Sequence, residues 1–136
     1  MNRLLTPAVG TLLLRIALGS VLLAHSLYLK VMVYGMAGTA QFFASIGLPE
    51  ILAYLVCTVE IIAGAALILG LYTRVASLAV IPILLGATWA HMGSGWLFTN
   101  TGGGWEYPFF LTIMAFVQAS LGDGQYAISE RLAHSV

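Results

Sequence analysis

The sequence contains few charged residues and one cysteine. Lysine and arginine number five, aspartate and glutamate also five, and the formal net charge is zero. Because there is no basic tract, the chain lacks the electrostatic footprint of a nucleic-acid-binding protein. Cys57 stands alone, which excludes an internal disulfide and a CxxC redox relay.

The sequence is rich in hydrophobic residues. Hydrophobic residues make up 60% of the chain, and the mean hydropathy of +0.98 is far above that of soluble domains. This composition predicts an integral membrane protein. A chain of 136 residues has room for a single domain, residues 1–136, with about four spans of roughly 20 residues each.

The apolar runs predict transmembrane helices at about residues 8–29, 50–71, 75–92 and 105–122. Arg15 interrupts the first run and no A-x-A site follows it, so we expect an uncleaved span. The mixed stretch "YGMAGTAQFFASIGLP" predicts a short amphipathic segment at the membrane interface. The predicted fold class is therefore an all-α membrane protein, an antiparallel four-transmembrane-helix bundle with that segment in its first outer loop.

The flanking basic residues predict the orientation of the chain. Arg3, Arg74 and Arg131 fall on one side of the predicted bundle, and Lys30 falls on the other. Since basic residues accumulate on the cytoplasmic side, we expect both termini in the cytoplasm and the loops of residues 30–49 and 93–104 outside.

Two ionisable residues fall inside predicted spans. At about 1.5 Å of rise per residue, Arg15 lies roughly 10 Å and Glu60 roughly 16 Å from the cytoplasmic ends. We predict a buried structural ion pair between them, with Gly19 and Gly64 allowing close helix approach. The alternative is that Arg15 reaches the cytoplasmic headgroups while Glu60 is protonated or faces a wet cavity.

A second polar layer lies near the outer face, where His25 and His91 come out roughly 25 Å and 24 Å from the cytoplasmic side. Glu106 begins the last span near the same layer. We predict a pocket open to the outer face in which His25, His91 and Glu106 are catalytic. In the alternative, each histidine caps its own helix or bonds a neighbouring carbonyl. Two histidines and a carboxylate could hold a metal, but they come from three spans without a local ligand motif, so no metal is predicted.

Aromatic residues crowd this outer region. An interfacial belt of anchors accounts for most of them; if the pocket forms, the candidate cofactor contacts are Tyr28, Trp89, Trp105 and Tyr107. The loop "GSGWLFTNTGGGW" has the glycines for a compact turn, and Trp96, Leu97 and Phe98 are too apolar to be left in water. We therefore expect it to fold back over the bundle as a lid.

Several stretches carry a family resemblance. The series "LLRIALGSVLLAHSLYLK", "FFASIGLPEILAYLVCTVEIIAGAALILGLYTRVASLAV", "GATWAHMGSG", "GGGWEYPFFL" and "GDGQYAIS" resembles the DoxX family of small four-span bacterial membrane proteins. The positions that match the family pattern are Arg15, Gly19, His25, Glu60, Gly64, Gly70, Arg74, His91, Glu106, Tyr107, Gly124 and Tyr126. The sequence departs from it in having Ser26 after the first histidine, Lys30 five rather than four residues beyond that histidine, and no aspartate in "AIS".

The resemblance implies a bacterial inner-membrane protein linked to redox, thiol-stress or sulfur metabolism. We expect a membrane subunit of a quinone-linked redox system that binds a quinone or a small sulfur or thiol compound near the outer face. His25 and His91 would exchange protons with the ligand, and Glu106 would orient a histidine. With no flavin or haem fingerprint, electrons would pass through the quinone or an oxidoreductase partner. The alternative is a non-catalytic membrane anchor or assembly subunit; oligomeric state is left open.

Overall fold

The computed structural model describes residues 5–133, which form helices and no β-strand. The elements in chain order are α1 (Pro7–Leu23), the π-helix η1 (Ala24–Val33), α2 (Gly35–Ser45), α3 (Ile51–Leu69), α4 (Thr73–His91), the 3-10 turn η2 (Met92–Ser94), α5 (Glu106–Leu121) and α6 (Ile128–Ala133). The all-helical prediction is confirmed, and α2 occupies the place of the expected segment in the first loop. Arg3, used in predicting the orientation, lies outside the described residues.

Within residues 5–133, three helices are long and apolar enough to cross a membrane, namely Pro7–Val33, Ile51–Leu69 and Thr73–Ser94. They correspond to the first three predicted spans. The first is longer than expected, because the helix continues as η1 to Val33 rather than ending near residue 29. The fourth predicted span corresponds to α5, which has 16 residues and a rise of about 24 Å; its crossing of the membrane stays a prediction.

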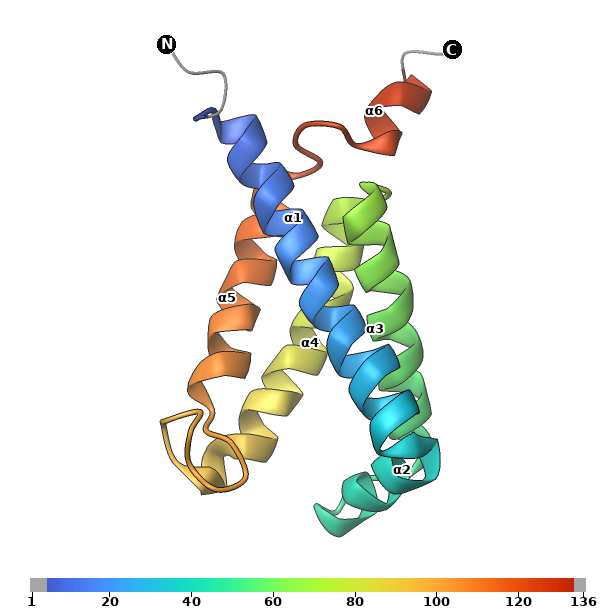
Figure 1. Cartoon of the computed structure of the whole chain (residues 1–136), viewed down its shortest axis with the longest axis vertical. Coiled ribbons are helices and arrows are strands. Elements are labelled where there is room, and N and C mark those ends of the chain that lie inside the picture. Colours follow the sequence, from blue (N-terminus) through green and yellow to red (C-terminus); the bar gives the residue numbers. More distant parts are fainter. Residues whose placement is uncertain (1–4, 134–136) are drawn as a thin grey trace.

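The long helices α1, α3, α4 and α5 run along the length of the molecule in alternating directions (Figure 1). Helix α1 packs on α3, α4 packs on α5, and α3 contacts α4. These two pairs diverge toward the end that holds α2 and the loop of residues 95–105, called here the loop end (Figure 1). The first and last described residues lie at the opposite end, called here the terminal end.

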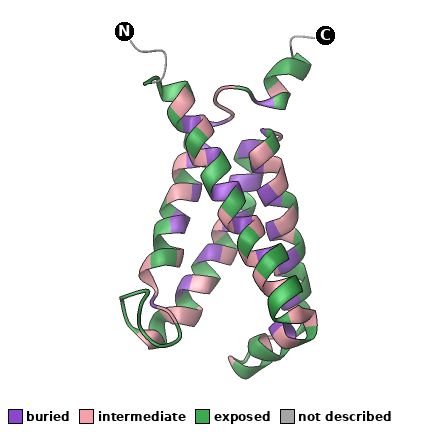
Figure 2. Cartoon of the chain, in the orientation of Figure 1, coloured by how far each residue is buried: buried purple, intermediate pink, exposed green. Residues whose placement is uncertain are grey.

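The core is a narrow seam of aliphatic and small residues between the helices (Figure 2). Helices α1 and α3 cross in close contact at Gly19 and Gly64. A Cβ on Gly19 would lie 2.7 Å from the Gly64 carbonyl oxygen, and one on Gly64 would lie 3.0 Å from the Gly19 carbonyl oxygen. The prediction that these glycines allow close approach is confirmed, since any side chain here would force the backbones apart.

The segment of residues 122–129, called here the C-terminal clasp, returns across the terminal end of the bundle. The Gln125 amide donates to the Ala8 carbonyl at 3.3 Å, and the Ser129 amide donates to the Gly70 carbonyl at 3.2 Å. Gly70 ends α3 with a φ of +71°, a conformation that favours glycine, and its Cβ position is blocked by Ala127. The clasp thus joins the start of α1 to the turn between α3 and α4.

Candidate functional site near the loop end

Glu60 forms an ion pair with Lys30 rather than with Arg15. The side chains are 6% and 20% exposed, respectively, and this is the one ion pair within residues 5–133. The predicted pairing of Arg15 with Glu60 is therefore wrong. Lys30, which entered the sequence analysis only as a basic residue of the outer side, compensates the buried carboxylate.

Side-chain direction explains the error. In a helix each side chain tilts toward the N-terminus of its own helix. Because α1 and α3 run in opposite directions, Lys30 and Glu60 tilt toward each other, whereas Arg15 tilts away toward the terminal end. Arg15 lies beside Gly70, ten residues and about 15 Å along α3 from Glu60.

Arg15 is bound at the terminal end and is only 1% exposed. Its Nη2 donates to the carbonyl of Gln125 at 3.1 Å, and the carboxylates of Asp123 and Glu130 lie within electrostatic range. Two outcomes were expected for Arg15: a pair with Glu60, or a side chain that reaches the cytoplasmic headgroups. The structure shows neither. The arginine anchors the C-terminal clasp instead.

The π-helix η1 sets the positions of His25 and Lys30. Its hydrogen bonds join residues five apart, one more than in an α-helix, so residues at that spacing share a side. Lys30 follows His25 by five residues, and its charge acts on His25. The Ser26 side chain is fully buried. Its hydroxyl donates to the Leu22 carbonyl at 2.7 Å, so the buried hydroxyl has a hydrogen-bond partner.

His25 reaches the neighbouring α5 helix. Its ring centroid lies 6.1 Å from that of Tyr107, with the two planes tilted by 40°. His91 on α4 is also within electrostatic range of His25. The structure therefore brings His25 and Tyr107 together from two helices, with His91 of α4 within electrostatic range, and all three carry groups that can donate or accept protons.

His91 also has a structural contact. Its Nδ1 lies 2.7 Å from the carbonyl oxygen of Ala87 in its own helix, the arrangement of the capping alternative. That nitrogen donates, so in the neutral ring Nε2 is left as an acceptor. The Nε2 edge lies against Gly103, whose Cβ position is 3.4 Å from His91 Cδ2.

Glu106 holds the loop rather than a histidine. Its Oε1 accepts a hydrogen bond from the Phe98 amide at 3.1 Å, and its own amide donates to the Trp96 carbonyl at 3.2 Å. Trp96 in turn stacks edge-on against Trp105 with centroids 4.5 Å apart. The loop of residues 95–105 is thus fastened to the start of α5, which explains why a glutamate follows the glycines.

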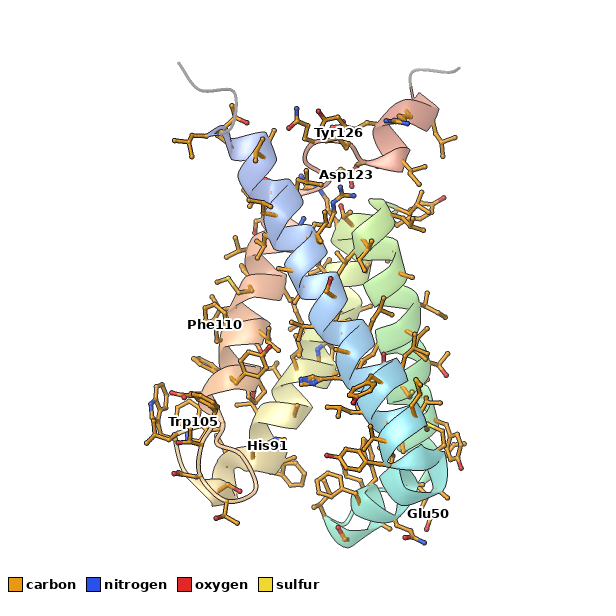
Figure 3. All side chains as sticks on the ribbon, viewed as in Figure 1. Glu50, His91, Trp105, Phe110, Asp123 and Tyr126 are labelled. Atoms are coloured by element: carbon orange, nitrogen blue, oxygen red, sulfur yellow. The ribbon has the colours of Figure 1, made fainter. Side chains whose placement is uncertain are left out.

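The loop lies at the end of the α4–α5 pair (Figure 1), and the expected lid over the bundle does not form. Trp96, Leu97 and Phe98 remain 53%, 50% and 63% exposed, so the loop's apolar side chains do not seal the bundle. Figure 3 shows Trp105 with this loop and His91 on α4 beside it, with Glu50 at the start of α3 across the loop end.

A groove of about 440 Å³ lies between the loop and the outer side of α5. Its lining consists of Trp96, Phe98, Glu106, Tyr107, Phe109, Phe110 and Ile113. Neither His25 nor His91 lines it. The predicted pocket is therefore divided: the histidines lie on one side of Tyr107, and Glu106 lies on the other.

The predicted cofactor contacts are divided as well. Tyr28 and Trp89 are 58% and 54% exposed and are absent from the groove, as interfacial anchors would be. Trp105 packs between Trp96 and Phe109. Tyr107 alone both contacts a histidine and lines the groove. Within residues 5–133 no three His, Cys, Asp or Glu side chains are grouped to hold a metal.

The sequence reading missed the polar network of the C-terminal clasp. Asp123 accepts hydrogen bonds from Thr73 and, at 2.7 Å, from Ser129. Burial pushes the pKa of Asp123 upward, but those hydrogen bonds and the charge of Arg15 outweigh it and leave the pKa lowered. The only sequence signal was the resemblance of "GDGQYAIS" to the family ending.

The helices, their apolar surfaces and the buried ion pair define an all-helical membrane protein. The sequence model of the DoxX family matches residues 10–93, well over half of the chain. The chain belongs to the DoxX family.

A relative from Bacillus subtilis (strain 168), named "Putative oxidoreductase CatD", is 42% identical over 79 residues. The match covers 58% of this chain and 57% of the relative, so the chain spans little more than half the length of that protein. No solved structure matches this chain.

Proposed function

We propose that this chain is the membrane subunit of a quinone-linked redox system, with the quinone held where His25, His91 and Tyr107 meet. The observation that carries the proposal is the position of His25. It is half-buried, its ring lies 6.1 Å from that of Tyr107, and the charges of Lys30 and His91 act on it. Side chains that exchange protons suit a quinone site, because the reduction of a quinone consumes protons.

A bound quinone would supply the redox chemistry, taking up two electrons and two protons to become a quinol. The residues of this chain would supply binding and protons. His25 and the Tyr107 hydroxyl can each donate to or accept from a carbonyl-type oxygen. His91, with Nδ1 committed to the Ala87 carbonyl, offers Nε2 as an acceptor. The Lys30–Glu60 pair fixes η1 against α3 and so keeps His25 in place.

Electrons would come from a partner oxidoreductase subunit, because the sequence has no flavin or haem fingerprint and no CxxC pair. The name of the Bacillus subtilis relative supports a redox setting. In this proposal the chain does not turn over a substrate by itself.

The test is quinone binding by the purified full chain in mild detergent, measured by tryptophan quenching and by mass spectrometry of co-purified small molecules. We expect bound quinone, and a loss of affinity of about tenfold or more, or about 1.4 kcal/mol, in His25→Ala, His91→Ala and Tyr107→Phe. Tyr28→Phe, which alters an exposed tyrosine on η1, is the matched control and should bind normally.

Two results would overturn this assignment. Co-purification of a small sulfur or thiol compound in place of a quinone would change the ligand class. A chain without any ligand but with a fixed stoichiometric partner would make it an anchor or assembly subunit.

We also propose that α5 completes a single four-span domain in a bacterial inner membrane, with both termini in the cytoplasm. Arg74 supports this arrangement, because its Nη1 donates to the Ala119 and Ser120 carbonyls at 2.8 Å and 3.1 Å. The Arg74 cation thus caps the C-terminus of α5. Because basic residues accumulate on the cytoplasmic side of a membrane, its position suits a terminal end that faces the cytoplasm. A reporter fused to the C-terminus should be active in the cytoplasm; activity only outside would refute the orientation.

A further inference from the structure

We infer that the groove beside α5 is a headgroup site for a phospholipid with a primary ammonium group, such as phosphatidylethanolamine. The groove of about 440 Å³ combines one carboxylate, Glu106, with aromatic walls. The groove shares Tyr107 with the histidine site, but Glu106, Phe110 and Ile113 belong to the groove alone, so variants of these residues test the inference separately from the proposed redox function.

The carboxylate supplies charge complementarity. Within residues 5–133 no lysine, arginine or histidine lies at ion-pair distance from Glu106. Its Oε1 accepts from the Phe98 amide, while Oε2 has no bond of this kind. The N-terminus of α5 contributes a partial positive charge of about half a unit, which the full negative charge of the carboxylate exceeds. A cation with N–H donors therefore meets a net attractive field and an open acceptor.

The walls of the groove favour an organic cation over a metal ion. Trp96, Phe98 and Tyr107 line it, and the faces of aromatic rings attract ammonium groups. A single carboxylate gives too few oxygen ligands for a hard metal cation, which takes six or more. The headgroup that fits is an amine, bound by one charged hydrogen bond and by ring faces.

The part of the groove that runs along α5 favours a lipid over a soluble amine. Phe110 and Ile113 continue the groove along α5 and are 53% and 45% exposed. Phe110 lies on the outer side of α5 (Figure 3). An acyl chain can follow these residues along α5, and tryptophan, the residue type at position 96, favours the headgroup region of a membrane. A soluble amine would leave this apolar wall without a partner.

The experiment uses the full chain, stripped of lipid and reloaded with an equimolar mixture of phosphatidylethanolamine, phosphatidylcholine and phosphatidylglycerol with identical acyl chains. Retained lipid is measured by native mass spectrometry. We expect phosphatidylethanolamine to be retained at least about threefold over each of the other two. Glu106→Gln should abolish this preference, since the amide keeps the acceptor for Phe98 but loses the charge. Glu50→Gln, an exposed carboxylate at the same end, is the control and should retain it.

A second pair of variants tests the groove without touching its charge. Phe110→Ala should lower retention of all three lipids, whereas Phe116→Ala, an exposed phenylalanine of α5 outside the groove, should not. Equal retention by the wild type, or an unchanged preference in Glu106→Gln, would overturn the inference. Displacement of the lipid by a decyl-substituted benzoquinone would also overturn it, because the groove would then belong to the redox ligand.

Discussion

Lys30 and Glu60 join η1 to α3 through an ion pair between a half-buried ammonium and a buried carboxylate, thirty residues apart in the sequence. Removing one partner leaves the other charge buried and uncompensated, which typically costs about 3 to 5 kcal/mol. Lys30→Met and Glu60→Gln should therefore each lower the thermal midpoint in detergent markedly, and the double variant should lose less than the sum.

Arg15→Met supplies the control for this cycle. Arg15 binds the clasp rather than Glu60, so combining Arg15→Met with Glu60→Gln should give additive losses within about 0.5 kcal/mol. Coupling between Arg15 and Glu60, with none between Lys30 and Glu60, would contradict the pairing in the structure.

The crossing at Gly19 predicts a sharp contrast among glycines. Gly19→Ala places a methyl group 2.7 Å from the Gly64 carbonyl oxygen, and overpacking of this kind costs about 1 to 3 kcal/mol. Gly86 lies in the interior of α4 with nothing within 4 Å of its Cβ position, so Gly86→Ala should be neutral or stabilise by up to about 1 kcal/mol. Thermal unfolding in one detergent checks both; equal effects would mean that α1 and α3 are not in close contact there.

The C-terminal clasp should loosen in acid. The pKa of Asp123 is lowered in the folded state, so its contribution to stability is fully present above the unfolded value, about 3.9. It is lost as the pH falls from there through the folded pKa. The protection factors of the Gln125 and Ser129 amides against hydrogen exchange, corrected for the pH dependence of the intrinsic rate, should therefore fall in the wild-type protein below about pH 4. In Asp123→Asn exchange should be faster at neutral pH and should lack this acid step. An acid step that survives in Asp123→Asn would assign it to another carboxyl group.

The loop of residues 95–105 depends on Gly104. A Cβ there would lie 2.2 Å from the carbonyl oxygens of Trp96 and Leu97, so Gly104→Ala should detach the loop from α5. Separation of Trp96 from Trp105 should appear as a change in tryptophan fluorescence. Gly93→Ala, with open space around its Cβ position, should leave the spectrum unchanged. A similar change in both variants would show that fluorescence does not report on this contact.

The helices could be predicted from the sequence because each apolar segment is about as long as a membrane-spanning helix requires. The close approach of Gly19 and Gly64 was expected because each glycine lies one turn from a residue of the predicted Arg15–Glu60 pair. That pair was predicted from the depths of the two residues along their helices. The depth estimate failed for Arg15 and Glu60, since it places Cα atoms and takes no account of side-chain tilt, which favoured Lys30. It also had no means of foreseeing η1, whose five-residue turns change the register of the helix.

The outer site was predicted only in part. His25, His91 and Glu106 do lie toward the same end of the molecule, as their depths indicated. The sequence could not show that Glu106 would bind the Phe98 amide, because that bond depends on how the loop closes. The clasp was missed for a related reason: its bonds from Gln125 to Ala8 and from Ser129 to Gly70 are made by backbone atoms, which every residue possesses.

The clasp also sets the order in which the chain can be completed during synthesis. Arg15 enters the membrane with the first helix, yet its hydrogen-bonding carbonyl belongs to Gln125, which the ribosome adds 110 residues later. Until then the guanidinium has no acceptor from the clasp. Chains truncated before residue 125 should therefore be less stable in detergent than the full chain, because they cannot form this hydrogen bond.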